Sequence, residues 1–234
     1  MGVIYDGVDL GRWLNIAYDE ALAPPVDVET ADVPGRDGSL FRRARLAEKT
    51  IPMRLRLRAL PSCDAAEYRR RIAPLLVKDR PCELVLPGDR TRRYMAILSG
   101  ESGLDTLWYT GSASVTFVCP DPVAYGKTRA CAFAASMAGE YDGTYPAAPR
   151  FSAVPPSGQD GYRVENAKTG EFVEVEHAFD GGQDVVVDCE SCTAAVAGRR
   201  VPVTFASDYF RIAPGAFEVR ATAASTMQFE ERWL

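Results

Sequence analysis

In the stretch Ile51-Pro52-Met53-Arg54-Leu55-Arg56-Leu57-Arg58-Ala59, apolar residues at every second position alternate with one proline and three arginines. Successive side chains of a β-strand point to opposite faces of a sheet, so this period of two predicts a strand with one apolar face. The opposite face carries the arginines at 54, 56 and 58. We expect the apolar face to pack on a hydrophobic core. The arginine face needs acidic groups or phosphate nearby.

A helical pattern follows this strand, and Ser62 or Asp64 can cap its amino-terminal end. Pro74 falls inside the pattern and is expected to kink or shorten the helix. Strand-like runs then follow at 82–86, 93–98 and 113–118. The first part of the chain therefore reads as a β-rich domain with one helix packed on its sheet.

The clearest boundary is Cys119-Pro120-Asp121-Pro122, where two prolines end a strand because they cannot donate ladder hydrogen bonds. We predict a first domain over residues 1–125, a crossing segment over 126–148 and a second domain over 149–234. The second domain shows short strand patterns between turns and no helical pattern, which is typical of an antiparallel β-sandwich. The fold class predicted for the chain is mainly β.

Strand patterns of the second domain include a hairpin of 162–165 with 171–177, which turns at Gly170. Branched and aromatic residues mark the later strands: Val185, Val186, Val187, Val201, Val203 and Phe205. A last pair is expected over about 216–222 and 227–233.

Composition excludes several classes of protein. The 234 residues carry a net charge of −5, which argues against a dedicated nucleic-acid binder. No run approaches the ~18–20 apolar residues of a membrane span, so we expect no membrane insertion. We also expect no secretory signal, because the first residues show no basic start followed by an apolar stretch. Residues 1–125 carry 17 basic and 17 acidic side chains, whereas 126–234 carry 10 and 15. The net negative charge of the chain therefore comes from its second half.

The sequence contains few candidate residues for a catalytic or metal site. His177 is the single histidine, and no nucleophile motif accompanies it. Cys189-x-x-Cys192 is half of a zinc or redox motif, but too few further ligands remain, so structural thiols are the favoured reading. We predict no catalytic residue, no metal site and no cofactor.

Two charged groups keep alternatives open. Glu171, Glu174 and Glu176 lie on one predicted strand, and a glycosidase needs two carboxyl groups only ~5–10 Å apart, although a solvated strand face is the favoured interpretation. Arg69-Arg70-Arg71 is a DNA-binding candidate, but a solvated or interface surface suits a domain without net charge better.

Several weak motifs occur in a fixed order along nearly the whole chain: 5–9, 33–38, 121–126, 164–171, 210–217 and 229–233. In this respect the chain resembles the distal tail proteins of long-tailed siphophages. The resemblance implies a first domain that builds a homo-hexameric ring and a galectin-like β-sandwich that projects outward. Ala216 departs from the family, which usually carries asparagine near this position, and the short loops resemble its compact members.

The same resemblance implies a place at the distal end of the phage tail in the virion, after synthesis in the host cytoplasm. The ring would join the tail tube protein to the tail-tip or tail-associated protein, with the tape measure or receptor-binding proteins as further partners. DNA would pass transiently through the lumen. Such a structural hub has no catalytic role.

An intersubunit arm is expected over residues 28–50. The turn at 33–38 carries Arg36 and Asp37, and the following basic run carries Arg42, Arg43 and Arg45. A ring interface between copies can supply acidic partners for this run and for the strand with Arg54, Arg56 and Arg58. Ring closure also removes exposed strand edges.

A carbohydrate-binding module is the alternative function. A galectin-like sandwich can present aromatic side chains for stacking on sugars, and the candidates are Tyr141, Tyr145 and Trp108. A monomer that binds a polysaccharide would favour this alternative over the hub.

Overall fold

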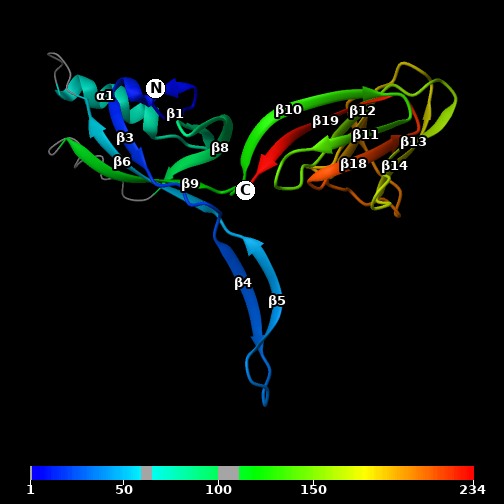
Figure 1. Ribbon diagram of the computed structural model, residues 1–234. Coiled ribbons are helices and arrows are strands. Elements are labelled where there is room, and N and C mark those ends of the chain that lie inside the picture. Colours follow the sequence, from blue (N-terminus) through cyan, green and yellow to red (C-terminus); the bar gives the residue numbers. More distant parts are fainter. Residues whose placement is uncertain (1, 59–64, 100–110) are drawn as a thin grey trace. The chain divides into compact units, whose positions relative to one another are not determined.

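The structure is a computed structural model that describes residues 2–58, 65–99 and 111–234, without the side chains of 65–69 (Figure 1). Two compact units divide the chain: residues 1–124 with Leu234, and Tyr125–Trp233. Both consist mainly of antiparallel strands, which confirms the predicted fold class. No helix among the described residues is long and apolar enough to cross a membrane.

The first unit contains one curved antiparallel sheet with the strand order β3-β6-β9-β8-β7-β1-β2. The chain order is β1 (Ile4–Tyr5), β2 (Val8–Asp9), the 3-10 helix η1 (Leu10–Arg12), β3 (Leu14–Tyr18), β6 (Lys49–Leu57), helix α1 (Ala65–Leu76), β7 (Cys82–Leu86), β8 (Asp89–Ser99) and β9 (Ser112–Cys119). Tyr5 and Phe117 pack edge to face in its core, with ring centroids 4.9 Å apart.

Strand β6 shows the predicted two faces. Ile51, Met53 and Leu55 are buried in the core of the unit, whereas Arg54 and Arg56 are exposed. The alternation follows from the pleat of the strand, which is paired on one side with β3 and on the other with β9.

Helix α1 contains Pro74 and ends two residues later, close to where the sequence predicted a break. Its predicted caps, Ser62 and Asp64, lie outside the described residues. Arg70 and Arg71 are exposed on this helix.

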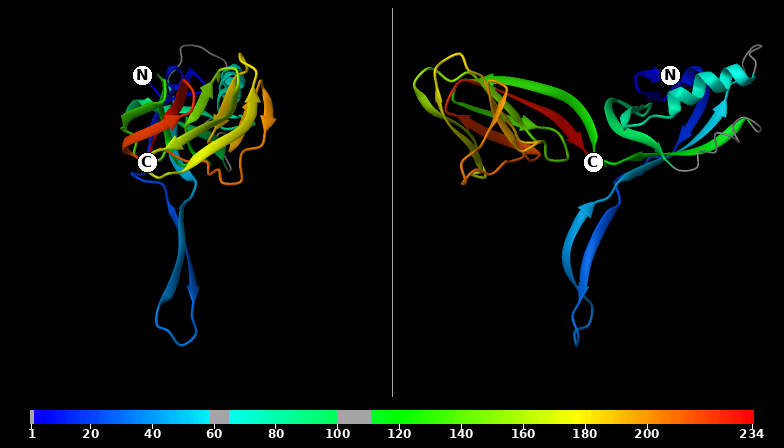
Figure 2. Two further views of the ribbon diagram at one scale, coloured as in Figure 1. Left: turned by 90° about the vertical axis from the view of Figure 1, so that its right-hand side faces the viewer. Right: turned by 180° about the vertical axis from the view of Figure 1, so that it is seen from behind.

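Between β3 and β6 the chain forms a separate two-stranded ribbon of β4 (Val26–Asp32) and β5 (Ser39–Leu46). Figure 2 shows this ribbon leaving the sheet of its unit where β3 ends and β6 begins. Gly35 and Gly38 in the connecting turn both have φ of 78°, a left-handed conformation that glycine adopts without steric cost. We call the ribbon with its turn, residues 26–46, the arm.

The second unit is built from two antiparallel sheets. One has the order β11-β18-β13-β14 and the other the order β17-β16-β15-β12-β19-β10. The strands are β10 (Ala124–Phe133), β11 (Ser136–Tyr141), β12 (Arg150–Ala153), β13 (Gln159–Asn166), β14 (Phe172–Phe179), β15 (Val185–Asp188), β16 (Thr193–Val196), β17 (Arg199–Val201), β18 (Gly215–Ala221) and β19 (Ser225–Trp233).

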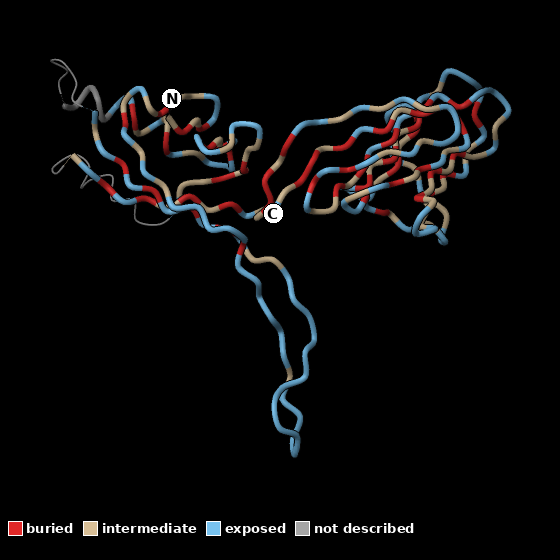
Figure 3. The backbone as a smooth tube through the Cα atoms, in the orientation of Figure 1, coloured by how far each residue is buried: buried red, intermediate tan, exposed pale blue. Residues whose placement is uncertain are grey.

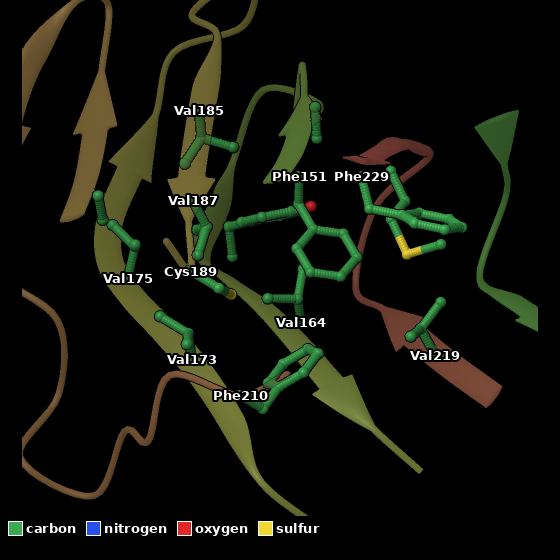
Figure 4. Close-up of a cluster of buried hydrophobic side chains, with 14 of the residues drawn as sticks. Phe151, Val164, Val173, Val175, Val185, Val187, Cys189, Phe210, Val219 and Phe229 are labelled. Carbon is green, nitrogen blue, oxygen red and sulfur yellow. The ribbon is translucent and has the colours of Figure 1, made fainter. Parts of the chain in front are cut away.

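Side chains from both sheets meet in one apolar core, which makes this unit a sandwich (Figure 4). Phe151 on β12 contacts Phe210 with ring centroids 5.8 Å apart, and Val164, Val173 and Val187 are fully buried beside them. The alternating valines and aromatic residues of the sequence form this core because every second side chain of each strand points inward.

Two features of this unit differ from the sequence predictions. Residues 126–148, set apart as a crossing segment, contribute to β10 and β11. Phe205, expected in a strand, lies in the connection from β17 to β18 and is fully exposed. Backbone hydrogen bonds hold this connection beside β14, for example from Asp208 N–H to the Phe172 carbonyl at 2.8 Å. The alternation of residue types could not predict these bonds.

Candidate functional site

Opposite charges face each other across the two strands of the arm. Asp27 lies opposite Arg45 and Glu29 lies opposite Arg43. Arg45 Nη2 is 3.3 Å from Asp27 Oδ2, and the Arg43 guanidinium donates a hydrogen bond to the Glu29 carboxylate. The ladder shifts register after Glu29, which brings Arg42 Nη1 to 3.9 Å from Glu29 as well. The basic run predicted to need acidic partners therefore finds them within its own hairpin.

The other face of the arm carries apolar side chains. Most residues of the arm are exposed to solvent (Figure 3). Val26, Val28 and Phe41 expose 53%, 58% and 63% of their surface. A two-stranded ribbon is marginally stable in water by itself, and a cluster of exposed apolar side chains marks an interaction surface. Cross-strand ion pairs on one face and an apolar stripe on the other give the arm the chemistry of a docking element.

The tip of the arm carries Arg36 and Asp37, both exposed. Arg36 N–H donates to the Val33 carbonyl at 3.2 Å, which closes the first part of the turn. The two predicted tip residues thus lie in the same turn, at the end of the arm opposite its base.

The arginine face of β6 lies between strands with small side chains. Asn15 and Ala17 of β3 pair with Arg56 and Arg54 on one side, and the small residues at 112 and 114 of β9 pair with them on the other. Neither arginine has an ion-pair partner within the described part of the chain. Arg58 instead donates to main-chain and amide oxygens of neighbouring residues.

The base of the arm is closed by a buried polar cluster that the sequence did not predict. Lys49, which is 2% exposed, directs Nζ to Tyr94 Oη at 2.9 Å and to Glu20 Oε1 at 3.3 Å. Tyr94 Oη donates to the same carboxylate oxygen at 2.6 Å. Burial and the Glu20 carboxylate together raise the pKa of Tyr94, and burial raises the pKa of the adjacent Cys119 thiol to about 12.

This cluster joins the two segments that carry the arm, because Glu20 follows β3 and Lys49 begins β6. Just above it, Ala47 N–H donates to the Pro25 carbonyl at 2.8 Å. The signal in the sequence was a lysine in the apolar register of an otherwise alternating strand, two residues before Ile51.

The residues considered for catalysis or metal binding make packing contacts or ion pairs, or are free thiols. His177 packs edge to face on Phe179, and Glu174 Oε2 lies 4.0 Å from Arg163. Cys189 is buried and Cys192 is an exposed free thiol. Within residues 2–58, 65–99 and 111–234, no group of histidine, cysteine and acidic side chains is arranged to hold a metal ion.

The aromatic candidates for sugar stacking do not form an exposed platform in the described residues. Tyr141 is buried, donates to the Tyr145 carbonyl at 2.6 Å and accepts a bond from Arg232 N–H at 2.8 Å. Trp108 lies outside the described residues. Tyr141 therefore stabilises the sandwich and is not available for stacking on a sugar.

Comparison with known families assigns both halves of the chain. Residues 16–119 match the phage tail protein RIFT-related domain, and residues 142–233 match the siphovirus-type tail component, C-terminal domain. The chain belongs to the siphovirus-type tail components, and the resemblance that its sequence motifs indicated is confirmed.

Two comparisons place the chain near one member of that class. It is 22% identical over 246 residues to the distal tail protein of Bacillus phage SPP1, covering 99% of this chain and 95% of that relative. The crystal structure of SPP1 Dit (gp 19.1) superposes with a TM-score of 0.81 at 20% identity, covering 100% of this chain and 99% of that one. That structure is described as a paradigm of the hub adsorption apparatus in phages infecting Gram-positive bacteria. The likeness shows that the fold is shared.

Proposed function

We propose that this protein is the structural hub at the distal end of a siphophage tail and acts in the virion as a ring of six copies. Its membership of the siphovirus-type tail components supports a structural role in the tail. The SPP1 relative carries the name of a distal tail protein, which supports the position at the tail end.

The observation that carries the ring is the arm. It has no core of its own, its strands pair only with each other in the described residues, and its apolar face is exposed. An element of this kind is stabilised when it packs on another chain, and a head-to-tail contact repeated around an axis closes into a ring. In this proposal Arg36, Asp37, Arg42, Arg43 and Arg45 belong to the arm that reaches the neighbouring copy.

The partners follow from the same role. The ring built by the first domain, predicted over residues 1–125, would join the tail tube protein to the tail-tip or tail-associated protein and let DNA pass. The galectin-like sandwich of the second unit would project outward, where receptor-binding or tape measure proteins are further partners. The proposal assigns no catalysis and no cofactor to the chain.

Deletion of the arm tests this function. Residues 26–46 are replaced by Asn-Gly, which suits the short span because Pro25 and Ala47 are already hydrogen bonded. Light scattering and native mass spectrometry are expected to give a hexamer for the intact chain and a folded monomer for the deletion. An intact chain that stays monomeric at every concentration, or a deletion that still forms hexamers, contradicts the ring built through the arm.

A further inference from the structure

Strand β3 is an edge of the sheet in the first unit, because β6 is its only ladder partner among the described residues. Two bonds fix the alternation of this ladder. Arg58 N–H donates to the Trp13 carbonyl at 3.0 Å, and Asp19 N–H donates to the Pro52 carbonyl at 3.1 Å. In an antiparallel pair, hydrogen-bonded residues alternate with residues whose main-chain groups point away. The odd-numbered residues of β3 therefore bond to β6.

Leu14 and Ile16 consequently direct their N–H and C=O groups toward the open edge. No hydrogen-bond partner for these groups lies in the part of the chain that the structure describes. Natural edge strands are commonly blocked by charged residues, proline or a bulge, yet the sequence of β3 is Leu-Asn-Ile-Ala-Tyr and its register with β6 is regular. This edge is open to the addition of another strand.

A basic groove of about 470 Å³ runs beside the edge and is lined in part by Leu14, Asn15 and Ile16. Arg58 lines this groove and lies over β3. Its Nε donates to Asn15 Oδ1 at 3.1 Å, and its Nη1 donates to the Gly11 carbonyl at 2.8 Å. Arg12 lines the same groove, whereas the carboxylate of Asp9 is held by the N–H groups of Gly2 and Gly11. The groove thus favours a strand that carries acidic side chains.

Strand β4 has the matching pattern. It begins Val26-Asp27-Val28-Glu29, with both acids on one face and both valines on the other. Among the described residues, the carboxylates pair with exposed arginines of the arm and with no other basic side chain. Exposed pairs of this kind contribute little stability. The acidic face of β4 can therefore exchange its ion pairs for others, and its valine face is stabilised when it packs on apolar side chains.

We propose that β4 of one copy adds to the open edge of β3 in the next copy, so that the sheet continues across the subunit boundary. The inference rests on the proposed ring and names the surface that receives the arm. Val26 and Val28 then extend the apolar layer formed by Leu14 and Ile16. Asp27 and Glu29 lie on the same side as the arginine face of β6.

The spacing of strands supports the ionic part of this contact. A strand added to β3 lies two strand positions from β6, or about 10 Å. The β3 residues that pair with Arg54 and Arg56 are Ala17 and Asn15. Their short side chains leave room for the two arginines to reach across to a carboxylate. Such a docked strand gives these two arginines the acidic partners that the described part of their own chain does not supply.

Complementation between two defective copies tests the inference. The edge variant Ile16→Pro removes one outward N–H that the isolated chain does not use, and Ile16→Ala is its matched control because it keeps that N–H. The arm variant Val26→Lys with Val28→Lys changes side chains that are exposed in the free chain. We expect both defective variants to be monomers by light scattering, Ile16→Ala to assemble, and an equimolar mixture of the two defective variants to form a one-to-one dimer.

Other results overturn the inference. Full-size assembly of either defective variant, a mixture that stays monomeric, or loss of assembly in Ile16→Ala equal to that in Ile16→Pro each contradicts strand addition while the ring proposal stands. A wild-type chain that is monomeric contradicts the ring itself. If circular dichroism shows that Ile16→Pro is unfolded, Arg54→Glu with Arg56→Glu replaces it as the edge variant, and its assembly to full size contradicts the contact.

Discussion

Lys49 Nζ lies 3.3 Å from Glu20 Oε1, and this ion pair joins the segment that enters the arm to the segment that leaves it. Tyr94 bonds to both partners, so the base of the arm is tied to the core of the first unit. A buried lysine is tolerated only when its charge is paired and hydrogen bonded. The pair therefore fixes where the arm leaves the sheet.

Replacing Lys49 by Met leaves the Glu20 carboxylate and the Tyr94 hydroxyl without their cation. We expect a loss of about 2 kcal/mol in the free energy of unfolding, because hydrogen bonds to charged groups contribute about 1.5–3 kcal/mol. Urea unfolding measures it, with Tyr94→Phe and the double variant completing a mutant cycle. Additive losses would show that the two side chains act independently.

Raising the pH above 9 is expected to destabilise the fold. Burial raises the pKa of Cys119 and of Cys189 from 9.0 to about 12, so the folded state keeps protons that the unfolded state has released. Stability from these thiols is fully present below pH 9 and is lost as the pH rises toward 12. Cys119→Ala should flatten the decline of the free energy of unfolding between pH 9 and 11, and an unchanged slope contradicts the assignment.

Alkylation should distinguish Cys192 from Cys189 in the second unit. Cys192 is exposed and Cys189 is buried with a raised pKa, and the thiolate is the reactive form. Brief treatment of the folded protein with iodoacetamide at pH 8 is expected to modify Cys192 and spare Cys189, as read by peptide mass spectrometry. Denatured protein, in which both react, is the control.

Truncation of two phenylalanines of the second unit should change its stability by very different amounts. Phe151→Ala removes a fully buried ring from the sandwich core and is expected to cost about 3–5 kcal/mol. Phe205→Ala, at a fully exposed position, should change stability by less than about 0.5 kcal/mol. Thermal unfolding of the isolated variants measures both, and a large loss for Phe205→Ala would mean that its ring is covered in solution.

The two-faced strand β6 was predictable from sequence because period-two alternation is a local property of the chain. The mainly β class and the β13–β14 hairpin of the second unit followed from the same kind of local signal, whereas the family was indicated by a resemblance of ordered motifs along nearly the whole chain. Lys49 occupies an apolar position of the same alternation. Its partners Glu20 and Tyr94 could not be predicted from the alternation, because they are distant in sequence.

The sequence by itself predicted most of the strand segments and showed where charge gathers along the chain. Only the tertiary structure decided which arginines are already paired: Arg43 and Arg45 form ion pairs with acids across the arm, whereas Arg54 and Arg56 form none with any residue that the structure describes. The physical reason is that strand pairing brings together residues by register, and register depends on the turn and the core rather than on the local pattern.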